Sequence, residues 1–423
     1  MQASFRERAA WCLFDFANSA FPTLALTAFG APYFQAVLVG PRGVDLGPLH
    51  LDGTSAWALT ISASMLVVTL SSPLVGALAD RGHKRALLLA YSAACVAATA
   101  GLAVLPPGSA LLAMALYAIA NVAFEGGYVF YNAFLPELAS PERLGRLSGA
   151  GWALGYAGGL GALACAAPLL PRDYAAAEAA AGGRVYLVVA GWYALFALPA
   201  LLVLRDRPRP GPAPIGVGSA FAEVGRTIRG LRHTPAILFF LVAYLLYADA
   251  IDTTIQFTGI YTQEVLSFTP SDNVRLFMVL NVVAGPGALA FGFLVDRIGA
   301  RRSIQITLGL WCGVIGLALA ATDRASFWPA AGLAAVVIGA TQAGSRALMA
   351  RLAPRERMAE LMGFLALSGK ASAVVGPLVY GAAAAAFAVP GDPAAGHRAA
   401  IACVGALFPL AMVALGRVRE AEG

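Results

Sequence analysis

Two short charged strings interrupt long apolar stretches of this chain, and they lie about half its length apart. The first string, GALADRGHKR, contains Asp80, and the second, GFLVDRIGARR, contains Asp296, which lies 216 positions further along a chain of 423 residues. Another pair, SPERLGRLSG (140–149) and APRERMAELMG (353–363), recurs at nearly the same spacing with one extra residue in the second copy. Self-similarity at a fixed offset predicts a duplicated structural unit.

The composition places both copies in a membrane. Hydrophobic residues make up 59% of the chain and charged residues 12%, whereas a soluble domain carries about 25% charged residues. Because a membrane helix needs about 20 mostly apolar residues, the sequence predicts an all-α integral membrane protein with twelve transmembrane helices. We expect these spans at about 11–39, 55–79, 86–105, 109–135, 147–170, 185–204, 236–265, 274–295, 303–322, 327–352, 360–388 and 398–416.

The positions of Lys and Arg predict the orientation of these spans. With the N-terminus inside, 21 of the 29 basic residues lie in cytoplasmic segments and six lie on the other side. We therefore expect both termini in the cytoplasm of a multi-pass protein. The formal net charge of +6 then reflects membrane orientation, and we expect no nucleic-acid partner.

The longest connection between spans divides the chain into two halves. We predict an N-terminal six-helix bundle at 1–204, a cytoplasmic linker at 205–235 and a C-terminal six-helix bundle at 236–423. The linker opens with RDRPRPGPAP and continues with apolar residues at helical spacing, which suits a short amphipathic helix on the inner leaflet. Two pseudo-symmetric six-helix bundles define the major facilitator architecture.

The two charged strings are predicted to act as gates at the cytoplasmic ends of the second and third spans of each half. An Asp at a helix end and basic residues in the next turn can make contacts in one state and lose them in another, and such differential contacts bias a conformational equilibrium. The gating candidates are Gly76, Asp80, Arg81, Lys84, Arg85, Gly292, Asp296, Arg297, Arg301 and Arg302.

Ionisable residues inside spans are costly, so each one predicts a functional site. In the fourth span, Asn121, Glu125, Tyr128 and Asn132 share one helical face, because they recur at i, i+4, i+7 and i+11. In the seventh span, Asp249, Asp252 and Gln256 also share a face. The remaining substrate or proton-coupling candidates are Asp15 and Asn18 in the first span, Arg346 in the tenth and Lys370 in the eleventh.

Each of these candidates also has a structural interpretation. The carboxylates of the seventh span can bind substrate or protons, or they can pair with Arg346 or Lys370 and hold helices together. Lys370 is one of two lysines in the chain, so it is a candidate for losing its proton when buried or for binding a substrate carboxylate. Asp15 can instead cap or pack a helix. The sequence leaves these alternatives open.

No cofactor or metal is expected. The five cysteines lie in apolar runs without a CxxC pair, and the four histidines lie in four different turns. The phosphate-binding pattern GxxxxGK[ST] is absent, which disfavours ATP-driven transport. No nucleophile–base pair is visible either, so we do not expect an enzyme.

Several strings together resemble the autophagy-related protein 22 (vacuole effluxer)-like branch of the major facilitator superfamily. They are WCLFDFANSAF (11–21), YNAFLPEL (131–138), LSGAGWALGYAGG (147–159), YADAIDTT (247–254) and the progression from Ser345 to Pro377. The resemblance covers nearly the whole chain. It implies a twelve-helix carrier, and fungal members are associated with amino-acid efflux from the vacuole.

The sequence therefore predicts a secondary active transporter that moves a small polar metabolite, such as an amino acid, by alternating access with proton coupling. The alternatives are a carrier that exports hydrophobic compounds or drugs, and a transporter-like receptor or scaffold that moves nothing. The expected partners are a small-molecule substrate, the lipid bilayer and a proton. We expect a monomer in the bacterial inner (plasma) membrane.

Overall fold

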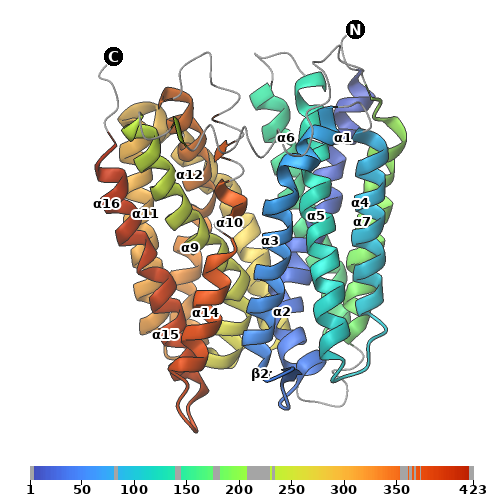
Figure 1. Ribbon diagram of the computed structural model, residues 1–423, viewed down its shortest axis with the longest axis vertical. Helices are drawn as coiled ribbons and strands as arrows, with labels where there is room; N and C mark the ends of the chain where they lie inside the picture. Colours follow the sequence, from blue (N-terminus) through green and yellow to red (C-terminus); the bar gives the residue numbers. More distant parts are fainter. Residues whose placement is uncertain are drawn as a thin grey trace. The chain divides into compact units, whose positions relative to one another are not determined.

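The computed structural model is mostly helical (Figure 1). It describes residues 4–80, 84–138, 144–174, 182–206, 229–230, 234–352, 361, 364–365, 368–371 and 373–418. Most of the predicted linker at 205–235 lies outside these ranges, as do parts of the repeated strings at 140–149 and 353–363. Among the described residues, eight helices are long and apolar enough to cross a membrane, or nine when the bent first pair is counted as one span.

Two compact units make up the chain. The first comprises Met1–Phe221 with Thr269–Met278, and the second comprises Ala222–Phe268 with Val279–Gly423. The elements of the first unit are α1 (Phe5–Asn18), α2 (Gly30–Tyr33), β1 (Val44–Leu46), β2 (Leu49–Leu51), α3 (Gly53–Asp80), α4 (Lys84–Leu102), α5 (Ala110–Leu138), α6 (Leu144–Ala166) and α7 (Arg184–Val203). Two π-helical segments (Phe21–Ala28 and Phe34–Val39) and a 3₁₀ turn (Ala167–Leu169) complete it.

The second unit repeats this order of helices. It contains α9 (Pro235–Leu266), most of α10 (Pro270–Ile298), α11 (Ala300–Ala320), α12 (Arg324–Leu352), α14 (Val375–Ala386), α15 (Pro393–Gly405) and α16 (Leu407–Gly416). In the first unit α4 packs against α5 and α7, and α1 packs against α6 and α7. In the second unit α11 packs in the same way against α12 and α16, and α9 packs against α14 and α16. The duplication therefore extends from the charged strings to helix packing.

The first span is bent, which differs from the continuous helix predicted at 11–39. Its two parts meet at an angle of 47°, and the π-helical segment Phe21–Ala28 precedes the bend. Pro22 lacks an amide proton, and the Thr27 hydroxyl donates to the carbonyls of Pro22 at 2.9 Å and Thr23 at 2.7 Å. Because the side chain satisfies these carbonyl groups, the backbone can leave α-helical geometry inside the membrane.

A short hairpin follows the first span and was not predicted. Strands β1 and β2 pair antiparallel, with Val44 opposite Leu51. Gly43 and Gly47 adopt φ values of 66° and 64°, which favour glycine at the turn positions.

The last two spans are interrupted at prolines. Residues 373 and 374 form a turn before α14, and Ala406 separates α15 from α16. Pro377 is the third residue of α14 and Pro409 is the third residue of α16, and a proline has no amide proton to donate to the carbonyl four places before it. At both places a new helix starts after a short turn.

Large apolar side chains cover the outside of the spanning helices. Leu70, Leu111, Leu195 and Val413 are 57%, 57%, 63% and 59% exposed. Such exposure on α3, α5, α7 and α16 suits contact with lipid chains and would be unfavourable in water.

Glycines of α6 allow close approach to α1. A Cβ atom at Gly158 would lie 2.1 Å from the carbonyl oxygen of Phe16, and one at Gly155 would lie 2.9 Å from the Ser19 Oγ. The glycine-rich string at 155–164 therefore permits close helix packing, as predicted from its small residues.

Replacing Gly158 by alanine should destabilise the protein. The added methyl group collides with backbone, so we expect Gly158→Ala to lower the free energy of unfolding by about 1–3 kcal/mol. Gly191 of α7 is the matched control, since a Cβ there meets nothing within 4 Å. Thermal unfolding in detergent should show a lower midpoint for Gly158→Ala than for Gly191→Ala, and equal midpoints would contradict the packing argument.

Candidate functional site

Asp15 is a buried carboxylate on α1, with 6% of its surface exposed. Its Oδ2 atom would lie 3.0 Å from a Cβ atom at Gly151 of α6, and the Tyr131 hydroxyl would lie 3.3 Å from the same point. The absence of a side chain at Gly151 therefore leaves room where the carboxylate and the hydroxyl lie next to each other. Both ion pairs found among the described residues involve other carboxylates, those of Asp45 and Glu137.

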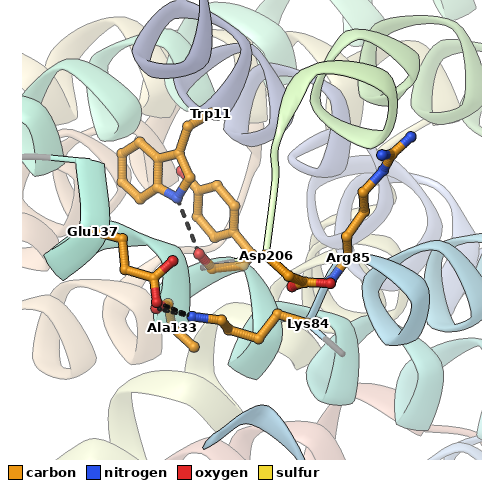
Figure 2. Close-up of polar contacts among 7 residues, drawn as sticks. Trp11, Lys84, Arg85, Ala133, Glu137 and Asp206 are labelled. Carbon is orange, nitrogen blue, oxygen red and sulfur yellow. Dashed lines mark hydrogen bonds and ion pairs between the residues drawn. The ribbon is translucent and has the colours of Figure 1, made fainter. Parts of the chain in front are cut away.

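Tyr131 is held firmly beside Asp15. The indole Nε1 of Trp11 donates to the Tyr131 carbonyl at 3.0 Å, and the two rings stack with centroids 4.5 Å apart (Figure 2). Phe14 stacks on Tyr131 with centroids 4.9 Å apart. The Tyr131 hydroxyl adjoins the Asp15 carboxylate and interacts with it. This cluster places an acid and a hydroxyl together in an apolar setting.

Asn18 lies one turn after Asp15 and is 3% exposed. Its Nδ2 atom has no hydrogen-bond partner among the residues that the structure describes. The Asp15 backbone carbonyl accepts from the Ser19 amide and from the Ser19 hydroxyl, the latter at 2.7 Å. The backbone rather than the Asp15 carboxylate thus completes the end of α1.

The predicted polar face of α5 divides into two parts. Asn121 is 3% exposed and donates to the Ser64 hydroxyl of α3 at 2.8 Å, so it joins two helices. Asn132 is exposed and donates to the Tyr128 carbonyl of its own helix at 2.9 Å. Glu125 and Tyr128 are half-buried between them.

Asp249 of α9 is the buried carboxylate of the second unit, with 4% of its surface exposed. The Gly376 amide of α14 donates to its Oδ1 atom at 2.8 Å. Asp252 and Gln256 are half-buried on the same helix, and the Gln256 Oε1 has no partner within the described ranges. The structure thus brings Asp249 to the start of α14. The predicted alternative was a pair with Arg346 or Lys370; the Arg346 side chain lies outside the described residues, and pairing of these carboxylates with Lys370 stays a prediction.

The other two predicted cations lie on different elements. Arg346 follows Ser345 in α12, and the Ser345 hydroxyl is 2.6 Å from the Tyr247 hydroxyl of α9. Lys370 is half-buried in the helical residues 368–371, just before the interruption that precedes α14.

Lys84 forms a buried ion pair with Glu137 at the start of α4 and the end of α5 (Figure 2). The two side chains are 7% and 5% exposed, and the Lys84 ammonium also lies 5.1 Å from the centre of the Phe134 ring. The neighbouring Arg85 donates from its amide to Asp206 at 3.1 Å and from Nε to the Leu201 carbonyl at 2.7 Å. Lys84 and Arg85 therefore link the start of α4 to the ends of α5 and α7 within one unit.

Arg301 plays the same part in the second unit. Its Nε donates to the Leu415 carbonyl at 3.2 Å and a terminal nitrogen donates to the Gly416 carbonyl at 2.7 Å. Arg85 and Arg301 lie 216 positions apart, as Asp80 and Asp296 do. Their contacts therefore align Arg85 with Arg301 in the same register as the two Asp residues.

The remaining gating candidates have less structural description. Arg297 and Arg302 are exposed, and Gly76 and Gly292 lie within α3 and α10. Arg81 and the side chains of Asp80 and Asp296 lie outside the described residues. Gating by these strings stays a prediction.

Sequence reasoning missed the residues that surround the two buried carboxylates. These are Trp11, Tyr131, Gly151, Thr253 and Gly376. Most stand inside or beside strings that were recognised as motifs, such as YNAFLPEL and YADAIDTT, yet a motif does not tell which residue on a distant helix a side chain meets.

Three comparisons with known proteins agree on the class. The family model described as vacuole effluxer Atg22 like matches residues 3–418. The MFS-type transporter YxiO of Bacillus subtilis (strain 168), named as uncharacterized, is 28% identical over 90% of this chain and 88% of its own length. Autophagy-related protein 22 of Coccidioides immitis (strain RS) is 24% identical over 86% of this chain and 74% of its own.

Solved transporter structures share the fold. A D-xylose-proton symporter superposes with a TM-score of 0.76 at 11% identity, covering 99% of this chain and 98% of its own. A bacterial homologue of the human lysosomal transporter Spinster superposes with a TM-score of 0.73 at 15% identity, covering all of both chains. At such identities the likeness concerns the fold.

Removing the Lys84 charge should destabilise the first unit. Lys84→Met leaves the Glu137 carboxylate buried without its cation, so we expect the free energy of unfolding to fall by about 3–5 kcal/mol. The double variant Lys84→Met/Glu137→Leu should recover much of that loss, because no charge stays buried. Arg302→Met, which changes an exposed residue, is the control. A single variant as stable as this control, in thermal unfolding, would contradict the argument.

Proposed function

We propose that this chain, which belongs to the vacuole effluxer Atg22-like family of major facilitator transporters, carries a small polar metabolite, in particular an amino acid, together with a proton. The family and the structural likeness establish a multi-pass transporter with the twelve-helix fold in two six-helix bundles, and not an enzyme. The predicted fold class is thereby confirmed. The identity of the substrate and of the coupling ion are the parts that we propose.

The observation that carries this proposal is a buried carboxylate on the first helix of each unit. Asp15 on α1 and Asp249 on α9 are 6% and 4% exposed, in segments that the membrane surrounds. A charged carboxylate there is costly unless it is compensated, and a bound proton removes the charge. Two such groups suit a carrier that takes up and releases protons as it opens alternately to the two sides of the membrane.

Polar groups with spare hydrogen-bonding capacity support a polar solute. The Asn18 Nδ2 and the Gln256 Oε1 have no hydrogen-bond partners within the described ranges. Donors and acceptors of this kind, together with carboxylates, can bind both the ammonium and the carboxylate of an amino acid. Export of hydrophobic compounds would instead favour apolar and aromatic walls.

The orientation in the proposal follows from the distribution of charge along the chain. We propose that both termini lie in the cytoplasm, because 21 of the 29 basic residues then lie on the cytoplasmic side. A location in the bacterial inner membrane and a monomeric state are further parts of the proposal. The predicted boundaries 1–204, 205–235 and 236–423 belong to the same proposal.

Proton coupling is tested by uptake into proteoliposomes under an imposed pH gradient. If one proton accompanies each solute, one pH unit should support about tenfold accumulation, since it supplies 1.36 kcal/mol. Asp249→Asn should abolish this dependence on the gradient, whereas the control Asp45→Asn, on the exposed hairpin, should retain it. Accumulation that ignores the gradient in the unmodified protein would reject proton coupling.

The substrate class is tested by thermal shift of the purified protein against amino acids, peptides and sugars. A ligand that binds the folded state raises the unfolding temperature in proportion to the logarithm of its concentration above Kd. We expect amino acids to give the largest shifts. Larger shifts with sugars or with hydrophobic drugs would replace the proposed solute.

A further inference from the structure

The start of α14 exposes backbone amides inside the second unit. Residues 373 and 374 form a turn, and the Val374 amide donates to the Ala371 carbonyl at 3.4 Å instead of continuing the helix. The N-cap residue is Val374, whose apolar side chain makes no cap hydrogen bond. The N-cap side chain thus offers no acceptor to the first amides of α14, and the buried Gly376 amide needs one from a neighbouring helix.

Asp249 of the neighbouring α9 supplies the missing acceptor. Its Oδ1 atom accepts from the Gly376 amide at 2.8 Å, at the second position of the helix, where an N-cap side chain commonly binds. A helix of 12 residues presents partial positive charge at this end, which stabilises an anion. The carboxylate of Asp249 thus occupies an anion site.

Thr253 adds an unused donor to the same place. It lies one turn after Asp249, is 0% exposed, and its hydroxyl has no hydrogen-bond partner among the described residues. A Cβ atom at Gly376 would lie 1.9 Å from the Thr253 Oγ1 and 2.5 Å from the Asp249 Oδ1. The hydroxyl and the carboxylate therefore both adjoin the Gly376 backbone, and a side chain at 376 would fill the site.

We propose that the Gly376 amide and the Thr253 hydroxyl form an anion-binding subsite that accepts the carboxylate of the transported solute in exchange for the Asp249 carboxylate. Two carboxylates cannot share one amide without strong repulsion. Asp249 leaves when it takes up a proton, because a neutral carboxyl group is a weaker acceptor than a carboxylate. The solute and one proton then enter together. The subsite itself still holds one carboxylate, while the second unit becomes one charge more positive, because the ammonium group of the amino acid enters with its carboxylate.

This exchange specifies how the proposed solute would bind, and it rests on the proposed function for the identity of that solute. The titratable residues of α9 besides Asp249 are Tyr244, Tyr247, Asp252, Tyr261 and Glu264. Those of the elements packed against α9 are Tyr380 of α14, His397, Arg398 and Cys403 of α15, and Arg324, Arg346 and Arg351 of α12, with Lys370 before the break and Arg417 after α16. Tyr380 and His397 contact each other, with 3.1 Å between the hydroxyl and Nδ1.

Chemical rescue tests the subsite without knowledge of the natural solute. Asp249→Ala removes the internal carboxylate and leaves a space of about its size at the start of α14. Sodium acetate, compared with sodium chloride at equal ionic strength, should raise the unfolding temperature of this variant by a few degrees. Asp15→Ala is the matched control, since it also removes a buried carboxylate, but one beside Gly151 rather than at the start of a helix.

The result that would overturn the proposal is an equal effect of acetate on Asp249→Ala and Asp15→Ala. Adding Thr253→Val to Asp249→Ala should reduce the effect of acetate, because the hydroxyl donor is lost while the side-chain volume is kept. If Asp249 served only as a helix cap, without a carboxylate site that includes Thr253, adding Thr253→Val would leave the effect of acetate unchanged.

If Asp249→Ala does not fold, Asp249→Asn decides the matter. Asn keeps the shape and an oxygen acceptor but no charge, so a carboxylate should displace it more easily. We expect L-leucine to bind at least fivefold more tightly to Asp249→Asn than to the unmodified protein, with leucinamide unchanged. Equal tightening for both ligands, or none for L-leucine, would reject the exchange. Failure of every amino acid to bind the unmodified protein would reject the proposed solute but not the acetate result.

Discussion

Every backbone N–H and C=O group inside a membrane needs a partner within the protein, and this constraint explains the main interactions of the structure. Continuous helices satisfy most of these groups. Where a helix bends or ends, a side chain replaces the missing backbone hydrogen bond. Thr27 donates to carbonyls at the bend of the first span, and Asp249 accepts a hydrogen bond from the Gly376 amide. Arg85 and Arg301 donate to carbonyls at the ends of α7 and α16.

The same constraint accounts for the positions of the polar residues. A polar side chain in an apolar interior is stable when it satisfies the backbone or another polar group. Trp11 and Arg85 do so through backbone carbonyls, and Asn121 does so through Ser64. Among the buried groups that the described contacts leave without partners, the Thr253 hydroxyl adjoins the Asp249 carboxylate. Spare hydrogen-bonding capacity is thus present at one of the residues proposed for transport.

Each unit repeats the other in helix packing but differs in its buried carboxylate. The packing of α4 on α5 and α7 recurs as that of α11 on α12 and α16, and the arginines 216 positions apart make equivalent contacts. Asp15, in contrast, lies beside a tyrosine hydroxyl, whereas Asp249 binds a helix amide. The duplication preserves the scaffold, and the site residues diverge within it.

The sequence alone determined the fold class, the placement of most spans and the identity of the intramembrane carboxylates. These depend on local properties, because apolar length, proline position and charge act through a single helix and its solvent. Tertiary structure decided what each polar side chain meets. Periodicity placed Asn121 and Asn132 on one face of α5, yet the face extends for about 16 Å, so one end packs on α3 while the other is exposed.

The neighbours of the buried carboxylates were likewise beyond the sequence. Asp249 was predicted to bind substrate or to pair with a cation, but its observed partner is an amide 127 positions away. Every residue except proline has a backbone amide, so the sequence does not mark the one that binds a side chain. The break before α14 leaves the Gly376 amide available, and Asp249 reaches it only because α9 packs against α14. Which residues of two helices face each other depends on the shapes of both helices. The sequence therefore identified the buried acids, whereas the tertiary structure determined their partners.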